Sequence, residues 1–90
     1  MSEVHTPIDC ISVITTSGRI TPLRFRLERG DRERLRVNIE QILSTRQIPY
    51  VGAEAQIFLC RGSVDGGREQ VFELKYTIRS HSWFLVQRVY

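Results

Sequence analysis

The stretch ITPLRFRLE, residues 20–28, decides the fold class. Leu23, Phe25 and Leu27 are separated by charged residues, which is the period-two pattern of a strand with one buried face. Pro22 has no backbone N–H to donate to a neighbouring strand, so we expect an edge or a β-bulge where this strand starts. The sequence therefore predicts a strand that buries these three apolar side chains and exposes arginines.

The next segment, RGDRERLRVNIEQIL, spans residues 29–43 and carries two periodicities. Leu35, Val37 and Ile39 alternate with polar residues as in a strand. Valine and isoleucine, which branch at Cβ, fit a pleated surface better than a helix. We therefore predict a second strand here, joined to the first by a loop around Gly30 and Asp31.

Helical alternatives for the same segment remain open. Asp31 could serve as a helix N-cap, and a helix over residues 33–46 would give a ββαβββ order. A shorter helical turn over residues 40–46 is the second alternative. The helical stripe consists of Leu35, Ile39, Ile42 and Leu43.

The register between the first two strands follows from the buried face. Residues directly opposite each other in an antiparallel pair share a face, so pairing Leu27 with Leu35 and Phe25 with Val37 requires a loop of odd length. The outer face then carries a cluster of arginines, with Arg26 opposite Arg36, Arg24 opposite Asn38 and Glu28 opposite Arg34.

The second half of the chain predicts two more hairpins. Asp65 and Gly66 lie between two strand-like runs, and Asp-Gly in that position favours a two-residue turn. That turn pairs Leu59 with Phe72, Ile57 with Leu74 and Ala55 with Tyr76. A turn at Ser80 and His81 then pairs Ile78 with Trp83, Tyr76 with Leu85 and, on the other face, Glu73 with Arg88.

These elements predict one all-β domain over residues 1–90, with residues 1–6 loose. Apolar and polar residues also partly alternate over residues 9–14, ahead of a turn-forming cluster at residues 15–18, which predicts one more strand. Six strands joined by short connections form an antiparallel meander, and so short a chain most simply closes it into a small barrel or a strongly curled sheet. In its size and in the spacing of its predicted strands, the chain resembles the SH3-like and OB-like small barrels. The resemblance concerns architecture alone, because no family motif accompanies it.

Composition narrows the function classes. The chain has 90 residues, a formal net charge of +3 and a pI of about 9.3, which permits anionic partners. The start of the sequence lacks the pattern of a signal peptide and no apolar run is long enough for a membrane span, so we expect a cytoplasmic protein. Twelve of its thirteen basic residues are arginines, and arginine binds phosphate in a forked geometry that lysine lacks.

No pattern of catalytic or metal-binding residues appears. The two histidines, His5 and His81, fall in a loose terminus and a turn, and neither is set beside a nucleophile and an orienting acid. Cys10 and Cys60 match no zinc, haem or redox spacing, so we predict buried thiols. We therefore expect a protein that is not an enzyme and that needs no cofactor or metal.

Two surfaces are candidates for a partner. The first is the apolar outer face predicted for the last three strands, which suits a protein partner or a homodimer; its candidate residues are Phe58, Val71, Phe84, Val86 and Tyr90, with Cys60 beside them. The second is the arginine hairpin, which suits a nucleic acid; its candidate residues are Arg24, Arg26, Arg34 and Arg36, with Arg29 and Arg32 in the loop. A protein-interaction or self-association module is the first hypothesis, and a small nucleic-acid-binding barrel is the second.

Overall fold

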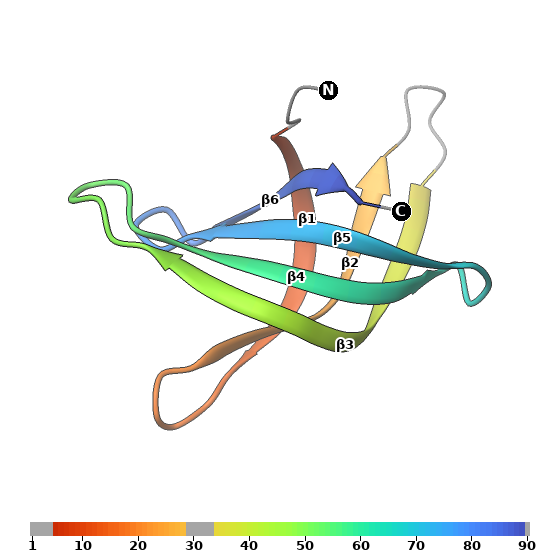
Figure 1. Cartoon of the computed structure of the whole chain (residues 1–90), viewed down its shortest axis with the longest axis horizontal. Helices are drawn as coiled ribbons and strands as arrows, with labels where there is room; N and C mark the ends of the chain where they lie inside the picture. Colours follow the sequence, from red (N-terminus) through yellow and green to blue (C-terminus); the bar gives the residue numbers. More distant parts are fainter. Residues whose placement is uncertain (1–4, 29–33, 90) are drawn as a thin grey trace.

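The structure is a computed structural model that describes residues 5–28 and 34–89. Each strand pairs antiparallel with the next, and the last pairs with the first, so the sheet closes into a barrel (Figure 1). This confirms the all-β meander and settles its closure. The strands are β1 (Thr6–Ile14), β2 (Ile20–Glu28), β3 (Arg34–Ile48), β4 (Ala55–Val64), β5 (Glu69–Thr77) and β6 (Ser82–Arg88).

The segment with two periodicities forms a strand. β3 continues from Arg34 to Ile48, so the helix over residues 33–46 and the helical turn over residues 40–46 are both wrong. The helical stripe arises because β3 contains two bulges, at Glu40 and Leu43, which shift the alternation by one residue each time. The bulges also bend the long strand (Figure 1). Asp31 lies outside the described residues.

The N-terminal strand begins earlier than expected. Thr6 pairs with Leu85 of β6, so the loose segment predicted for residues 1–6 does not extend to its last residue. Residues 1–4 lie outside the described part of the chain.

The register predicted between β2 and β3 is confirmed in full, from Arg24 opposite Asn38 to Glu28 opposite Arg34. The start of β2 differs in one residue. Leu23 forms a bulge between two paired residues of β2, and its neighbour Pro22 takes the inward position. Leu23 is therefore 45% exposed, and its predicted place in the core is wrong, although the bulge expected near Pro22 is present.

The β4–β5 hairpin is shifted by one residue from the predicted register. Asp65 and Gly66 form the expected tight turn with positive φ, and Gly67 N–H donates to the Val64 carbonyl at 2.9 Å. The ladder, however, closes with Val64 N–H donating to the Arg68 carbonyl, so three residues lie between this bonded pair where the prediction had two. A slip of one residue exchanges the two faces. The observed pairs are Cys60 with Phe72, Phe58 with Leu74 and Gln56 with Tyr76, in place of those predicted for Leu59, Ile57 and Ala55.

The β5–β6 hairpin keeps the predicted inner face but not the predicted pairs. Tyr76 lies opposite Trp83 and Leu74 opposite Leu85. Ile78 lies beyond the end of β5, where it is exposed, so its pairing with Trp83 is wrong. A bulge at Val86 sets Glu73 opposite Gln87, so the predicted pair of Glu73 with Arg88 is wrong too.

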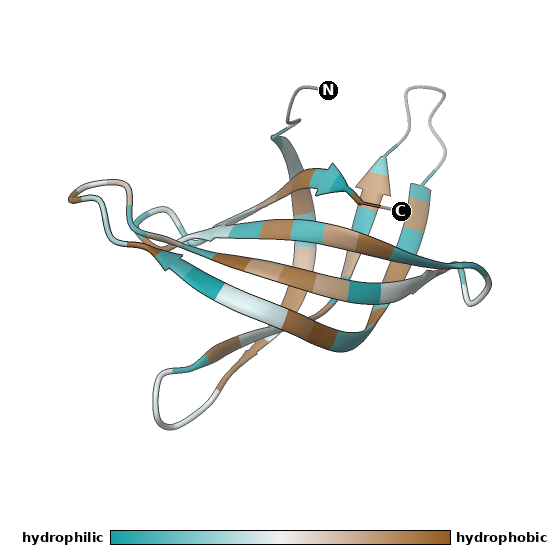
Figure 2. Cartoon of the chain, viewed as in Figure 1, coloured by the Kyte–Doolittle hydropathy of each residue, from teal (hydrophilic) through white to brown (hydrophobic). Residues whose placement is uncertain are grey.

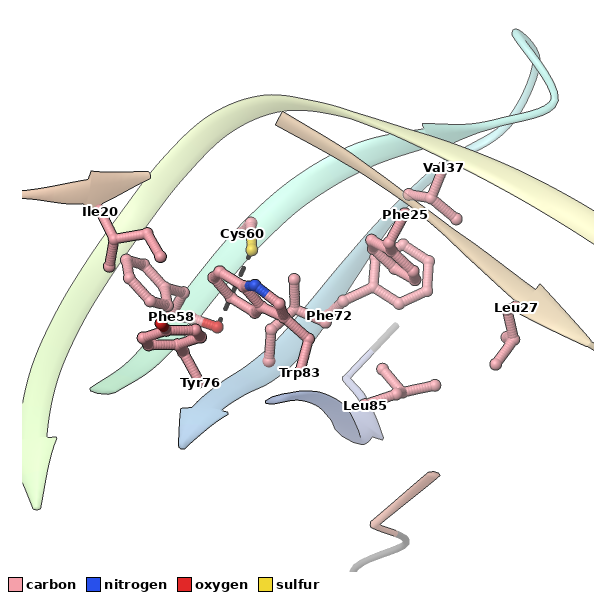
Figure 3. Packing of buried hydrophobic residues seen from close by; sticks show 11 residues of the cluster. Ile20, Phe25, Leu27, Val37, Phe58, Cys60, Phe72, Tyr76, Trp83 and Leu85 are labelled. Carbon is pink, nitrogen blue, oxygen red and sulfur yellow. Dashed lines mark hydrogen bonds between the residues drawn. The ribbon is translucent and has the colours of Figure 1, made fainter. Parts of the chain in front are cut away.

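One hydrophobic core fills the barrel (Figure 3). Phe25 and Phe72 meet edge to face, with ring centroids 5.3 Å apart, and Trp83 lies between Tyr76 and Phe58, at 4.9 and 5.5 Å. Brown and teal residues alternate along β2 and the first part of β3 in Figure 2, as the period-two pattern requires. The core members are Ile20, Phe25, Leu27, Val37, Phe58, Cys60, Phe72, Leu74, Tyr76, Trp83 and Leu85.

Candidate nucleic-acid interface

The four arginines singled out in the sequence lie on one outer surface of β2 and β3. Arg26 is directly opposite Arg36, and both side chains are exposed. Arg24 and Arg34 lie at the two ends of the same ladder and are exposed as well. We call Arg24, Arg26, Arg34 and Arg36 the arginine face. Arg29 and Arg32, which the sequence placed beside it, lie outside the described residues.

Carboxylates neutralise half of the arginine face. Asp9 of β1 accepts a hydrogen bond from Arg26 at 3.2 Å, and Glu28 lies 4.0 Å from Arg34. Exposed ion pairs of this kind contribute little to stability, because water already solvates both charges. Within residues 5–28 and 34–89, the side chains of Arg24 and Arg36 have no hydrogen-bond or ion-pair partner. Their guanidinium groups are therefore available to an external anion.

A hollow of about 300 Å³ lies between β1 and the arginine face. Ile11 and Asp9 of β1 form one wall, because Ile11 is opposite Arg24 and Asp9 is opposite Arg26. Arg36 lines the same hollow from β3, so three of the four arginines reach one concave surface. An anion in the hollow could accept hydrogen bonds from more than one guanidinium group.

Asp65 holds β3 in place behind the arginine face. Its carboxylate accepts a hydrogen bond from the backbone N–H of Arg36 at 2.9 Å, and its own N–H donates to the Arg36 carbonyl at 2.7 Å. The tip of the β4–β5 hairpin thereby fixes the backbone from which Arg36 projects. A fixed backbone lowers the ordering cost of binding.

The apolar outer face proposed for the last three strands does not form as predicted. Phe58 is 3% exposed and belongs to the core, as does Cys60, because the β4–β5 register is shifted. Val86 is also only 3% exposed. Val71 and Phe84 are half-buried, and Tyr90 lies outside the described residues.

The outer side of β4 carries other apolar residues, Ala55, Ile57 and Leu59, and charged side chains cross it. Arg46 of β3 is opposite Ile57, and Glu73 of β5 is opposite Leu59. Arg46 bonds Glu73 at 3.3 Å, so this pair spans β4 between the two apolar side chains. The alkyl part of arginine covers apolar surface in such positions, and Ile57 is buried.

Sequence reasoning missed an apolar strip on the β1–β2 hairpin. Ile11 and Val13 lie on the same side of β1 and are 51% and 44% exposed. The exposed bulge residue Leu23 lies on the neighbouring strand, beside Arg24. Pro22 was the available signal, because a bulge at this position turns the residue next to it outward.

The thiols and histidines offer little chemistry. Burial raises the pKa of both Cys10 and Cys60 from 9.0 to about 12, with the nearby Cys60 thiol adding to the shift at Cys10. A protonated thiol is a weak nucleophile at neutral pH. His81 Nδ1 lies 2.8 Å from the Tyr76 hydroxyl, which ties the β5–β6 turn to the core. No group of three His, Cys, Asp or Glu side chains gathers at a metal-binding geometry in the described ranges.

Comparison with protein-family models, with curated proteins and with solved structures finds no match to this chain. Among residues 5–28 and 34–89 there is no helix with the length and apolarity that crossing a bilayer requires.

Proposed function

We propose that the protein is a non-enzymatic binding domain whose arginine face holds the phosphate backbone of a nucleic acid. The observation that carries the proposal is the pair Arg24 and Arg36. Both are exposed on one face, both line the same hollow, and neither has a side-chain partner in the described part of the chain. Exposed guanidinium groups without a protein partner can bond phosphate oxygens in a forked geometry.

The direct opposition of Arg26 and Arg36 supports the same proposal. Like charges opposite each other on neighbouring strands destabilise a sheet. Asp9 offsets the charge of Arg26 only, since its carboxylate bonds that side chain. A bound phosphate would relieve the repulsion that remains, and this would give the arrangement a use that folding alone does not.

The test is a titration of fluorescein-labelled 20-nucleotide oligonucleotides, single-stranded and duplex, at several potassium chloride concentrations. Arg24→Gln combined with Arg36→Gln is the test variant. Lys75→Gln combined with Arg79→Gln is the matched control, because it removes the same charge from β5 and from the β5–β6 turn, away from the arginine face. We expect the test variant to bind more weakly and the control to bind like the unchanged protein.

The salt dependence gives a second, quantitative readout. Each lost phosphate contact lowers the slope of log K against log salt by about 0.7 for a single strand and about 0.9 for a duplex. The test variant should therefore have a slope smaller by about 1.4 or about 1.8, since it loses two contacts. An equal loss of affinity in both double variants would show that binding depends on net charge alone. That result would exclude the arginine face as the binding site.

Self-association is the second candidate, and the exposed strip formed by Ile11, Val13 and Leu23 favours it. Apolar side chains gathered on one surface are typical of protein interfaces. Sedimentation of the unchanged protein and of Val13→Ser in the titration buffers tests this candidate. A dimer that dissociates in Val13→Ser would support it, whereas a monomer at all concentrations would exclude it.

A further inference from the structure

β2 and β3 pair with each other over only part of their length, which leaves the barrel open between them. Their ladder begins with Arg24 opposite Asn38; before Arg24, β2 pairs only with β1, and after Asn38, β3 pairs only with β4. In Figure 1 the tip of the β1–β2 hairpin leaves the rest of the barrel, while β3 curves along β4. The bulges at Glu40 and Leu43 lie where β3 turns away.

A hollow of about 480 Å³ lies at this opening between β2 and β3. Its lining combines apolar side chains, uncharged polar side chains and two arginines, and it includes no acidic residue. We call this hollow the seam. It is lined by Arg19, Ile20, Thr21, Ile42, Thr45, Arg46, Gln47, Gln56 and Phe58.

Polar side chains occupy positions that face the barrel interior at the seam. Thr45 is opposite the core residue Phe58, and Gln47 is opposite Gln56, so these side chains share the inner face. Thr45 and Gln47 are nevertheless exposed, because β2 does not cover them. Their polar groups are therefore open to water and accessible to a ligand that enters the hollow.

The chemistry of the seam matches an unpaired base. Within the part of the chain that the structure describes, the side chains of Gln47 and Gln56 have no hydrogen-bond partner. A free amide offers donors and an acceptor, which is what the edge of a base requires. Ile42 is half-buried and lines the seam above the core residues Ile20 and Phe58, so the bottom of the hollow is apolar where the face of a base would lie.

The seam also lies close to the arginine face along β2. Arg24 is the first residue of β2 that pairs with β3, and the β2 residues that line the seam, Ile20 and Thr21, precede it by a few positions. Arg19 and Arg46 line the seam on its two sides, although Arg46 also bonds Glu73. A backbone held by Arg24 could therefore continue past the seam with a second cation near its next phosphates.

We propose that the nucleic acid is single-stranded and that one of its bases enters the seam, with its edge on Gln47 and Gln56. This proposal rests on the proposed function, since the arginine face holds the backbone. A duplex cannot supply this base without unpairing it, which costs free energy. The domain should therefore prefer a single strand to a duplex.

The chain contains a reporter for the seam. Trp83 is the sole tryptophan, and its ring centroid lies 5.5 Å from that of Phe58, which lines the seam. A base that enters the seam changes the surroundings of Phe58 and should therefore change the emission of Trp83. The probes are a 12-nucleotide oligothymidine, an abasic backbone of the same length and a 12-base-pair duplex.

We expect oligothymidine to change Trp83 emission and to bind about tenfold more tightly than the abasic backbone. Gln47→Ala and Gln56→Ala should each remove most of that tenfold difference while leaving binding of the abasic backbone unchanged. Gln70→Ala is the matched control, because it removes an amide outside the seam. Unchanged melting temperatures establish that each variant is folded.

The outcomes separate this inference from the proposed function. If all three probes bind equally and the double variant of Arg24 and Arg36 still weakens them, the arginine face is retained and the seam proposal is overturned. A change in Trp83 emission with the duplex would overturn it as well. If none of the probes binds, both proposals fall together.

Discussion

Replacing Phe58 tests the β4–β5 register most directly. In the register with a two-residue turn Phe58 would point outward, whereas in the structure it is 3% exposed and packs 5.5 Å from Trp83. Phe58→Ala should lower the free energy of unfolding by about 3–5 kcal/mol, the usual cost of removing a buried phenyl ring. A domain of this size has about 5–14 kcal/mol in total, so the loss is large.

Urea unfolding followed by Trp83 fluorescence measures this loss. With a slope of about 2 kcal/mol per molar urea, the midpoint should fall by about 2 M. If Phe58→Ala does not fold, Phe58→Leu keeps much of the side-chain volume and should give a smaller loss in the same direction.

Leu23→Ala is the control for this experiment, because Leu23 was predicted to be buried and is exposed, the reverse of Phe58. The alternation of β2 placed Leu23 inside, and the structure leaves it 45% exposed. Its replacement should cost less than about 1 kcal/mol, because little apolar area is lost. A cost for Leu23→Ala greater than that for Phe58→Ala would refute both the bulge in β2 and the observed β4–β5 register.

Three further changes test other features. The Cys60 thiol has its pKa raised from 9.0 to about 12, so the stability it contributes is complete below pH 9 and is lost as the pH rises towards 12. Between pH 7 and pH 10 this amounts to about 1.4 kcal/mol in urea unfolding, and Cys60→Ala should lack that part; an identical pH dependence in both proteins would contradict the burial argument. Gly62→Ala places a Cβ 2.8 Å from the Asn38 carbonyl oxygen and from Val37 Cγ1, so it should cost about 1–3 kcal/mol and lower the melting temperature. An unchanged melting temperature would mean that β3 and β4 are farther apart. Asp65→Ala removes the acceptor for Arg36 N–H and leaves alanine at a φ of 52°, so it should cost about 1–3 kcal/mol, whereas Asp65→Asn should cost less because asparagine keeps an acceptor and tolerates this φ; equal costs would argue against the hydrogen bond.

The sequence predicted best where only one face of a strand is apolar. Along β2 and β3, shifting the register would have buried Arg26 or Arg36, so the alternation permitted a single solution and the arginine face followed from it. The same reasoning could not reveal that Asp9 neutralises Arg26, because β1 and β2 are aligned through a bulge.

Prediction was less successful where both faces of a strand are apolar. In β4, the set with Ile57 and Leu59 is as apolar as the set with Phe58 and Cys60. Only the length of the turn determines which set is buried, because it sets the register. Gly67 lengthens the turn by one residue, which the Asp-Gly pattern does not reveal. The open seam was also hidden, since it depends on bulges in β3 that disturb the alternation without a glycine or proline to mark them.

The pairing of β1 with β6 also determines when the barrel can be completed. These strands are joined from Thr6 opposite Leu85 to Ile8 opposite Trp83. During synthesis on the ribosome, β1 can therefore pair with β2 early, but it cannot pair with β6 until the segment Ser82–Arg88 has emerged. Until then the nascent sheet has two uncovered edges and an unfinished core, and unpaired edges of this kind bind chaperones or other chains most readily.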